Sequence, residues 1–247
     1  MAENRHDPVR QAVGSAGQRA DPGVARQLSE LARELQADIT SGALLNHIVR
    51  AAVTEVPGAQ YAGITQVTGK EFITTAASDE LVGRLDQLQY QAGDGPCLDA
   101  ARRHETVRCD DLLGEGRWPQ FGALAAGLGV GSVLSIQLFA GDDSFGALNL
   151  YATSVNAFNA DSESTGILLA SHAALAMASE RAQAGLLTAL DHREIIGEAK
   201  GILMERYKVT EVEAFGLLVA SSQAVNRKLR DISAHLVATG ELLTPSR

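Results

Sequence analysis

The stretch SVLSIQLFAGDDSFGALNLYAT, residues 132–153, carries the clearest fold signal in this chain. Its two apolar runs, Ser132–Phe139 and Phe145–Thr153, flank the turn-forming residues 141–144. Apolar runs of this length, separated by glycine and aspartate, are typical of two antiparallel strands joined in a β-hairpin. We therefore predict a hairpin at these residues.

Upstream of the hairpin, the chain shows both helical and strand patterns. Apolar residues recur at helical spacing before Pro57-Gly58, and two further apolar runs flank Thr68-Gly69-Lys70. The order of helices, hairpin, loops, hairpin and helix predicts an α+β fold, in which helices flank an antiparallel sheet. The predicted helices are 28–35, 44–53, 80–89, 119–127 and 161–206, and the other predicted strands are Tyr61–Val67, Phe72–Ala76 and Thr106–Cys109.

Residues 186–243 predict a separate, small all-α module of three helices. Thr210 and Glu213 match a capping box, which begins a helix that runs to about Val219. Ser221 or Ser222 is the expected N-cap of the third helix. The third helix is expected to stop at Gly240 and to bury a stripe made of Val225, Leu229, Ile232 and Leu236.

Charge is divided unevenly along the chain. The net charge of −9 comes from 21 basic and 30 acidic residues. Residues 186–247 hold eight of each kind, so the whole net negative charge lies in residues 1–185. A neutral module lacks the strongly basic surface of a tight, non-specific nucleic-acid binder, so binding there would depend on local patches.

The two cysteines, Cys97 and Cys109, form no CxxC pair and have too few neighbouring ligands for a metal site. Isolated thiols suit a reducing compartment. No signal-peptide pattern and no apolar run long enough to span a bilayer occur, so we expect a cytoplasmic protein without a membrane segment. Residues 1–24 are polar and aperiodic, and we predict a disordered tail there.

Several separated motifs in the first part of the chain resemble a GAF domain. The resemblance covers about residues 28–180 and predicts a GAF sensor domain at 25–183. It implies a pocket over the sheet for a small-molecule or redox signal, but it leaves the ligand or cofactor unknown, because one fold hosts many functions. The motifs are Gly95-Pro96, a strand that ends at Asp110, Trp118, Phe121, Gly131–Leu134 and Gly146–Leu150.

Cys97 is the candidate residue for redox or ligand sensing. It follows a glycine-rich turn and precedes a predicted short helix, and a thiol at a helix N-terminus can have a lowered pKa. The competing interpretation is a small apolar filler of the core. One class of GAF enzymes reduces free methionine sulfoxide with clustered cysteines, but residues 118–131 contain none. No hydrolase or nucleotide-binding motif occurs either, so we predict no enzymatic activity and no catalytic residue.

The C-terminal module contains a set of cationic and amide side chains that suit RNA. On the first helix, Arg193 and Lys200 share a face with Gly197 and Gly201, where a phosphate backbone could approach closely. The competing interpretation is that these charges are ordinary solvated side chains. The predicted RNA-binding residues are Arg193, Lys200, Asn226, Arg227 and Arg230.

The same module resembles an ANTAR domain, which we place at 184–243. The resemblance implies binding of paired stem-loops in nascent RNA, which blocks a transcription terminator. Loop bases are unstacked and reachable, and arginine, lysine and asparagine suit phosphate and base-edge contacts. The shared residues are Arg193, Ile196, Ala199–Met204, Glu213–Phe215, Leu218, Ser221 and Asn226–Arg230.

These patterns together predict a transcription antiterminator in which a GAF sensor controls an RNA-binding ANTAR module. A homodimer is expected, because Ile167, Ala170, Ala174 and Met177 offer a narrow seam for a partner helix. The alternative is that this face packs against the helices at 28–55. The alternative function is a redox- or ligand-sensing GAF regulator that acts through a protein partner.

Overall fold

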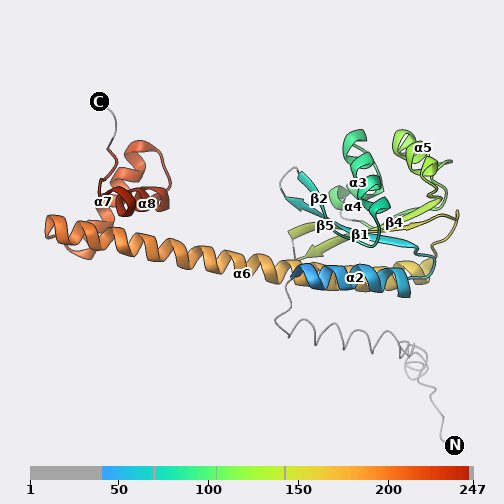
Figure 1. The fold of residues 1–247 in the computed structure, drawn as a ribbon, viewed down its shortest axis with the longest axis horizontal. Coiled ribbons are helices and arrows are strands. Elements are labelled where there is room, and N and C mark those ends of the chain that lie inside the picture. The colour runs from blue at the N-terminus through green and yellow to red at the C-terminus, as the bar shows by residue number, and fades with distance from the viewer. Residues whose placement is uncertain (1–40, 69–70, 104, 142, 245–247) are drawn as a thin grey trace, which may run out of the picture. The chain divides into compact units, whose positions relative to one another are not determined.

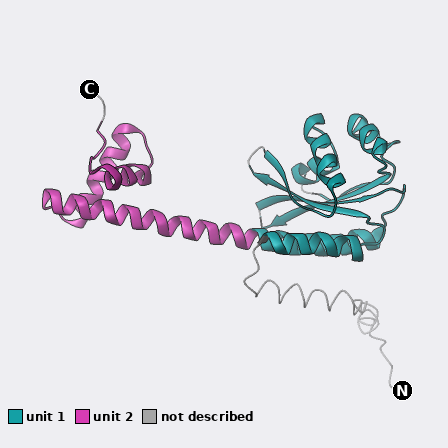
Figure 2. Ribbon diagram, in the orientation of Figure 1, with its two compact units in different colours: residues 1–177 teal, residues 178–247 magenta. Residues whose placement is uncertain are grey.

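The computed structural model describes residues 41–68, 71–103, 105–141 and 143–244. The predicted tail at 1–24, the predicted helix at 28–35 and the Gly69-Lys70 turn lie outside the described residues. The chain divides into two compact units, unit 1 up to Met177 and unit 2 from Ala178 (Figure 2).

Unit 1 is built on a five-stranded antiparallel sheet. Its strands are β1 (Tyr61–Thr68), β2 (Glu71–Ala77), β3 (Val107–Cys109), β4 (Ser132–Ala140) and β5 (Asp143–Ala152). They lie in the order β2-β1-β5-β4-β3, and the predicted hairpin is confirmed as β4 and β5, paired from Ser132 with Ala152 onward. Nearly every residue of this pair is buried, which explains why apolar residues occur on both faces of its strands instead of alternating with exposed polar ones.

Helices cover both faces of the sheet. Figure 1 shows α3, α4 and α5 over one face and α2 with the first part of α6 along the other. This arrangement confirms the α+β prediction. The helices of this unit are α2 (Ser41–Glu55), α3 (Glu80–Ala92), α4 (Pro96–Arg103), α5 (Pro119–Gly127) and the start of α6 (Ala160–Tyr207).

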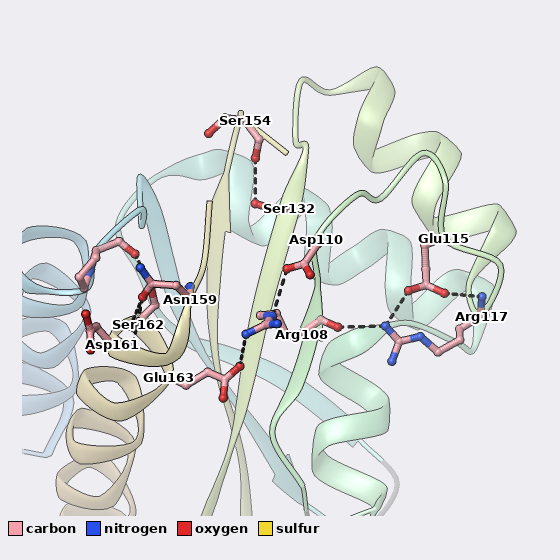
Figure 3. Close-up of polar contacts among 11 residues, drawn as sticks. Arg108, Asp110, Glu115, Arg117, Ser132, Ser154, Asn159, Asp161, Ser162 and Glu163 are labelled. Carbon is pink, nitrogen blue, oxygen red and sulfur yellow. Dashed lines mark hydrogen bonds and ion pairs between the residues drawn. The ribbon is translucent and has the colours of Figure 1, made fainter. Parts of the chain in front are cut away.

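Polar side chains from the loop before α6 and from strand β3 hold the start of α6 in place. The Oδ1 atom of Asn159 accepts hydrogen bonds from the backbone N–H groups of Asp161 (2.9 Å) and Ser162 (3.0 Å). Arg108 on β3 bridges Asp110 (3.0 Å) and Glu163 (2.7 Å), so the first turn is also tied to the sheet edge (Figure 3). These ion pairs are partly exposed, and each contributes at most about 1 kcal/mol.

Packing against the sheet holds the same helix more firmly. A Cβ atom at Gly166 would lie 2.4 Å from Cδ1 of Ile136, so the missing side chain lets α6 approach β4 closely. Ala170, Ala174 and Met177 are buried in this unit, whereas Ile167 is exposed. The predicted dimer seam is therefore wrong, because three of its four residues belong to the unit's own core.

Unit 2 is the predicted three-helix module, formed by the end of α6, α7 (Glu211–Val225) and α8 (Leu229–Thr239). The capping box is confirmed, since Thr210 Oγ1 accepts from Glu213 N–H and the Glu213 carboxylate accepts from Thr210 N–H. Its core consists of Ala199, Leu203, Ala214, Leu218, Ile232 and Leu236.

The boundary between the second and third helices differs from the prediction. The α7 helix continues through Ser221 and Ser222 to Val225, because these hydroxyls donate to the carbonyls of Leu243 and Arg227 instead of capping a helix. Asn226 ends α7 in the left-handed conformation at φ 50°, which asparagine tolerates better than most residues. Val225 therefore lies on α7 and not on the third helix.

None of the helices in the described part of the chain could cross a bilayer, and this includes α6 with its 48 residues.

Close approach of β5 to β1 makes Gly146 a sensitive position. Its φ is +141°, and a Cβ atom there would lie 1.8 Å from the Thr65 carbonyl oxygen. We expect Gly146→Ala to lower the free energy of unfolding by about 3 kcal/mol or more in a denaturant titration. Gly127→Ala, at the end of α5 with open space around it, should change it by less than about 1 kcal/mol. Equal losses in the two variants would contradict this account of β5.

Candidate functional site

A buried carboxyl group lies at the centre of unit 1, between the sheet and α3. Asp86 accepts hydrogen bonds from the hydroxyls of Thr65 (2.9 Å), Thr74 (2.5 Å) and Tyr151 (3.2 Å). Burial raises the pKa of Asp86 above its ordinary value, and the three hydroxyl donors oppose that rise. The carboxyl group is therefore held by neutral donors in a place that disfavours its charged form.

Further polar side chains extend this group into a buried polar cluster. Asn149 donates to Thr65 Oγ1 (3.1 Å) and accepts from Ser135 Oγ (2.8 Å). Gln89 accepts from the backbone N–H of Cys97 (2.8 Å) and donates to the Tyr151 hydroxyl (3.4 Å). The cluster joins β1, β2, β4, β5, α3 and the start of α4. The sequence analysis did not predict this cluster. Single polar residues inside apolar strands could have indicated it, because a buried polar side chain needs hydrogen-bond partners.

Cys97 belongs to the same buried environment. Its side chain is fully buried, and this burial, with Asp86 nearby, raises the pKa of the thiol to about 12. A lowered pKa, which the helix N-terminus could have given, is not found, because desolvation outweighs the short α4 helix, and the burial agrees with the alternative of a small filler of the core. Cys109 is buried as well, and burial raises the pKa of its thiol to about 11. Both thiols stay protonated at neutral pH in this structure.

An open cleft of about 420 Å³ lies beside the cluster, between β2, α3 and α4. Phe72 and Tyr90 stack in it with ring centroids 5.5 Å apart, and the Arg102 guanidinium lies 5.9 Å from the Phe72 ring centre. The Tyr90 hydroxyl donates to Thr65 Oγ1 (3.4 Å), so one side chain lines the cleft and contacts the cluster. Aromatic walls with one cation suit a small, partly apolar ligand.

The described residues hold no group of three or more metal-ligating side chains that could bind an ion.

In unit 2, the five predicted RNA-binding residues differ in exposure and in their partners. Arg193 and Arg227 are exposed, and neither forms an ion pair with any described residue. The space above Gly197 and Gly201 is open, as the prediction of close backbone approach requires. Asn226 has a structural reason for its identity, since it caps α7 in the left-handed conformation.

The two other cations are already engaged. Lys200 pairs with Glu211 on α7 and holds the pKa of that carboxyl below its ordinary value. Arg230 donates to Asp231 (3.0 and 3.1 Å) and contacts His192 Nε2 (3.1 Å).

The surroundings of Arg230 are strongly acidic. It lines an open cleft of about 630 Å³ together with four carboxylates, those of Asp191, Glu194, Glu198 and Asp231. A polyanion is repelled by such a cleft. At 100° per residue, Arg193 and Lys200 lie on the other flank of α6. The structure therefore separates Arg230 from Arg193 and Lys200 by charge.

The raised pKa of Asp86 has a consequence for stability. Because its folded-state pKa lies above the ordinary value of 3.8, the group stabilises the fold below that pH, and this contribution is lost as the pH rises through the folded-state pKa. Relative to wild type, Asp86→Asn should gain unfolding free energy as the pH is raised from about 4 to about 8, by about 1.4 kcal/mol per unit of pKa shift.

Denaturant titrations over this pH range would measure the difference, with Glu80→Gln on the exposed side of α3 as the control. A difference between wild type and Asp86→Asn that does not vary with pH would show that the buried carboxyl is not shifted.

Comparisons with known proteins agree with this architecture. A model of the GAF domain matches residues 39–178, more than half of the chain, and a model of the ANTAR domain matches residues 184–237. No curated protein matches the chain.

Two solved structures share the fold of unit 1. The GAF domain of a phosphoenolpyruvate-protein phosphotransferase from Coxiella burnetii is 17% identical, with a TM-score of 0.51, and the match covers 66% of this chain and 96% of that one. A free methionine-R-sulfoxide reductase from Neisseria meningitidis, in complex with its substrate, is 16% identical, with a TM-score of 0.50 and coverage of 66% and 95%. At these identities the similarity shows the fold alone. The chain belongs to the GAF domain family, and an ANTAR domain follows its GAF domain.

Proposed function

We propose that this chain is a signal-responsive transcription antiterminator whose ANTAR domain binds paired stem-loops in nascent RNA. The observation that carries the proposal is the ANTAR match over residues 184–237, which coincides with a compact three-helix unit that exposes Arg193 and Arg227. GAF and ANTAR domains are regulatory, and the proposal contains no catalytic step. Such a protein acts in the cytoplasm, on transcripts as they are made.

The RNA contacts in this proposal follow the charge of the surface. Arg193 and Arg227 bind phosphates directly, because they are exposed and unpaired among the described side chains. Lys200 joins them when a phosphate replaces Glu211, an exchange that is inexpensive because surface ion pairs are weak. Asn226 adds a contact from the same turn as Arg227. Arg230 contributes least, since it would have to leave Asp231 and the acidic cleft.

The input signal in this proposal is a small molecule that binds the cleft beside Phe72, Tyr90 and Arg102. Tyr90 transmits its presence to the buried polar cluster, in which Cys97 contributes to ligand sensing through its N–H contact with Gln89. The thiol of Cys97 is not the sensor in this scheme, because it is buried and protonated.

A homodimer presents two RNA-binding modules together, and α6 offers a face for it that differs from the predicted seam. Residues 181–190 are all exposed, although they include Leu186, Leu187 and Leu190. At 100° per residue, Leu186 and Leu190 fall within about 40° of one another on the helix. Pairing of two such stripes removes leucine side chains from water and raises affinity for paired stem-loops by avidity.

RNA binding is tested with an RNA that carries two adjacent stem-loops, against a single-loop control. We expect Arg193→Ala and Arg227→Ala each to weaken binding on the order of tenfold and to reduce the slope of log K against log salt concentration by about 1. Arg84→Ala, an exposed cation on α3 in unit 1, should leave both quantities unchanged. Absence of RNA binding by the wild type, with and without candidate ligands, would favour the alternative of a protein partner.

The dimer is tested by sedimentation velocity. Leu186→Lys combined with Leu190→Lys should convert the protein to a monomer and lower its affinity for the two-loop RNA about 10- to 100-fold, toward that for one loop. Ala184→Lys, also exposed but on the opposite side of α6, should stay dimeric. A monomeric wild type that binds the two-loop RNA tightly would rule out this pairing.

A further inference from the structure

Three exposed apolar side chains of unit 2 lie on the helix faces that carry one ion pair. Met204, Tyr207 and Phe215 remain 36%, 53% and 43% exposed. Met204 and Tyr207 follow Lys200 by four and seven residues on α6, and Phe215 follows Glu211 by four residues on α7. Residues at these spacings share a helix face, so all three lie on the faces that meet at the Lys200–Glu211 pair. We call Met204, Tyr207 and Phe215 the aromatic surface.

The charge of α6 selects which class of molecule can approach this surface. The other flank of the helix carries Asp191, Glu194 and Glu198, which line the acidic cleft. On the flank of the aromatic surface lie Arg193 and Lys200, and the space above Gly197, about 40° from Arg193 on the helix, is open. A polyanion is therefore repelled by one flank and attracted by the other.

The chemistry of the aromatic surface suits unpaired nucleobases. Bases in an RNA loop are splayed out, and proteins bind them by stacking on aromatic rings beside cations that hold the phosphates. Tyr207 and Phe215 supply two exposed rings, and Met204 supplies a polarisable thioether that adapts to a flat partner. Lys200 lies within the same surface, paired only with the exposed carboxylate of Glu211.

We propose that the aromatic surface binds unpaired loop bases of the RNA by stacking on Phe215 and Tyr207, while Lys200 exchanges Glu211 for the adjacent phosphate. This inference rests on the proposed function and extends it, since it names the residues that hold the bases. The phosphate contacts at Arg193 and Arg227 position the RNA, and the rings select unpaired nucleotides over a duplex.

The variants in this test remove an aromatic ring without removing a charge or much side-chain volume, so a loss of affinity can be assigned to the ring. Phe215→Leu keeps an apolar side chain of similar bulk without a π face, and Tyr207→Leu does the same on α6. We expect each variant to weaken binding of the two-loop RNA about 5- to 100-fold, with the salt slope unchanged, because no phosphate contact is removed. Phe215→Trp should retain wild-type affinity.

Two controls test for misfolding of the variants and for non-specific binding of RNA to exposed apolar side chains. Val212 on α7 is 81% exposed, more than Phe215, and has no ring. The Val212→Ala variant should therefore bind RNA as the wild type does. The Phe215→Trp variant also reports contact directly, because RNA should quench its fluorescence. In the wild type the single tryptophan, Trp118, is buried in unit 1, so quenching there should be small.

The outcomes distinguish this inference from the proposed function. Wild-type affinity in both leucine variants, or no quenching in Phe215→Trp, would overturn base stacking and leave RNA binding intact. A reduced salt slope in Phe215→Leu would also overturn it, since that result assigns the position to phosphate contacts. If the wild type binds no RNA, both proposals fail, and the surface is then better explained as a docking site for a protein.

Discussion

Helix α6 belongs to two hydrophobic cores, and this constraint organises the whole chain. In unit 1 it buries Ala170, Ala174 and Met177 and approaches β4 at Gly166. In unit 2 it supplies Ala199 and Leu203 to the core of the three-helix module. Between these stretches, residues 181–190 of the same helix are exposed. One continuous helix therefore runs from the GAF domain into the ANTAR domain.

Strand β5 brings the sensor interior close to that helix. Asn149 and Tyr151 belong to the buried polar cluster. Leu150 lies between them in the chain and faces α6, because a Cβ atom at Gly166 would lie 3.4 Å from Cδ1 of Leu150. Alternation along a strand places these neighbours on opposite faces of the sheet. The cluster contains a carboxyl group held only by hydroxyl donors, and one of these donors, Thr65, also accepts a hydrogen bond from Tyr90 in the cleft. One strand thus carries the polar cluster on one face and contacts α6 on the other.

In the C-terminal module, acidic and basic side chains lie on different sides, although its total charge is zero. Four carboxylates gather in the cleft that holds Arg230, whereas Arg193 and Lys200 lie on the other flank of α6. A module of equal positive and negative charge can bind a polyanion when the two signs occupy different sides. The same separation explains why a count of basic residues did not reveal which cations are accessible.

The sequence by itself determined the elements whose signals are local. The β4–β5 hairpin, the capping box at Thr210 and Glu213, and the α+β order all follow from residues within a few positions of one another, and all are present in the structure. The likeness to GAF and ANTAR domains was also readable, because it rests on motifs spread along each domain.

Only the tertiary structure decided which side chains are buried or paired. Cys97 has a raised pKa because distant strands enclose it, and Ala170, Ala174 and Met177 form part of a core instead of a dimer seam. Lys200 and Arg230 are engaged by Glu211, Asp231 and His192, two of which lie on other helices. Burial and ion pairing depend on segments that are far apart in the chain, and helical or strand periodicity carries no information about which of these segments meet.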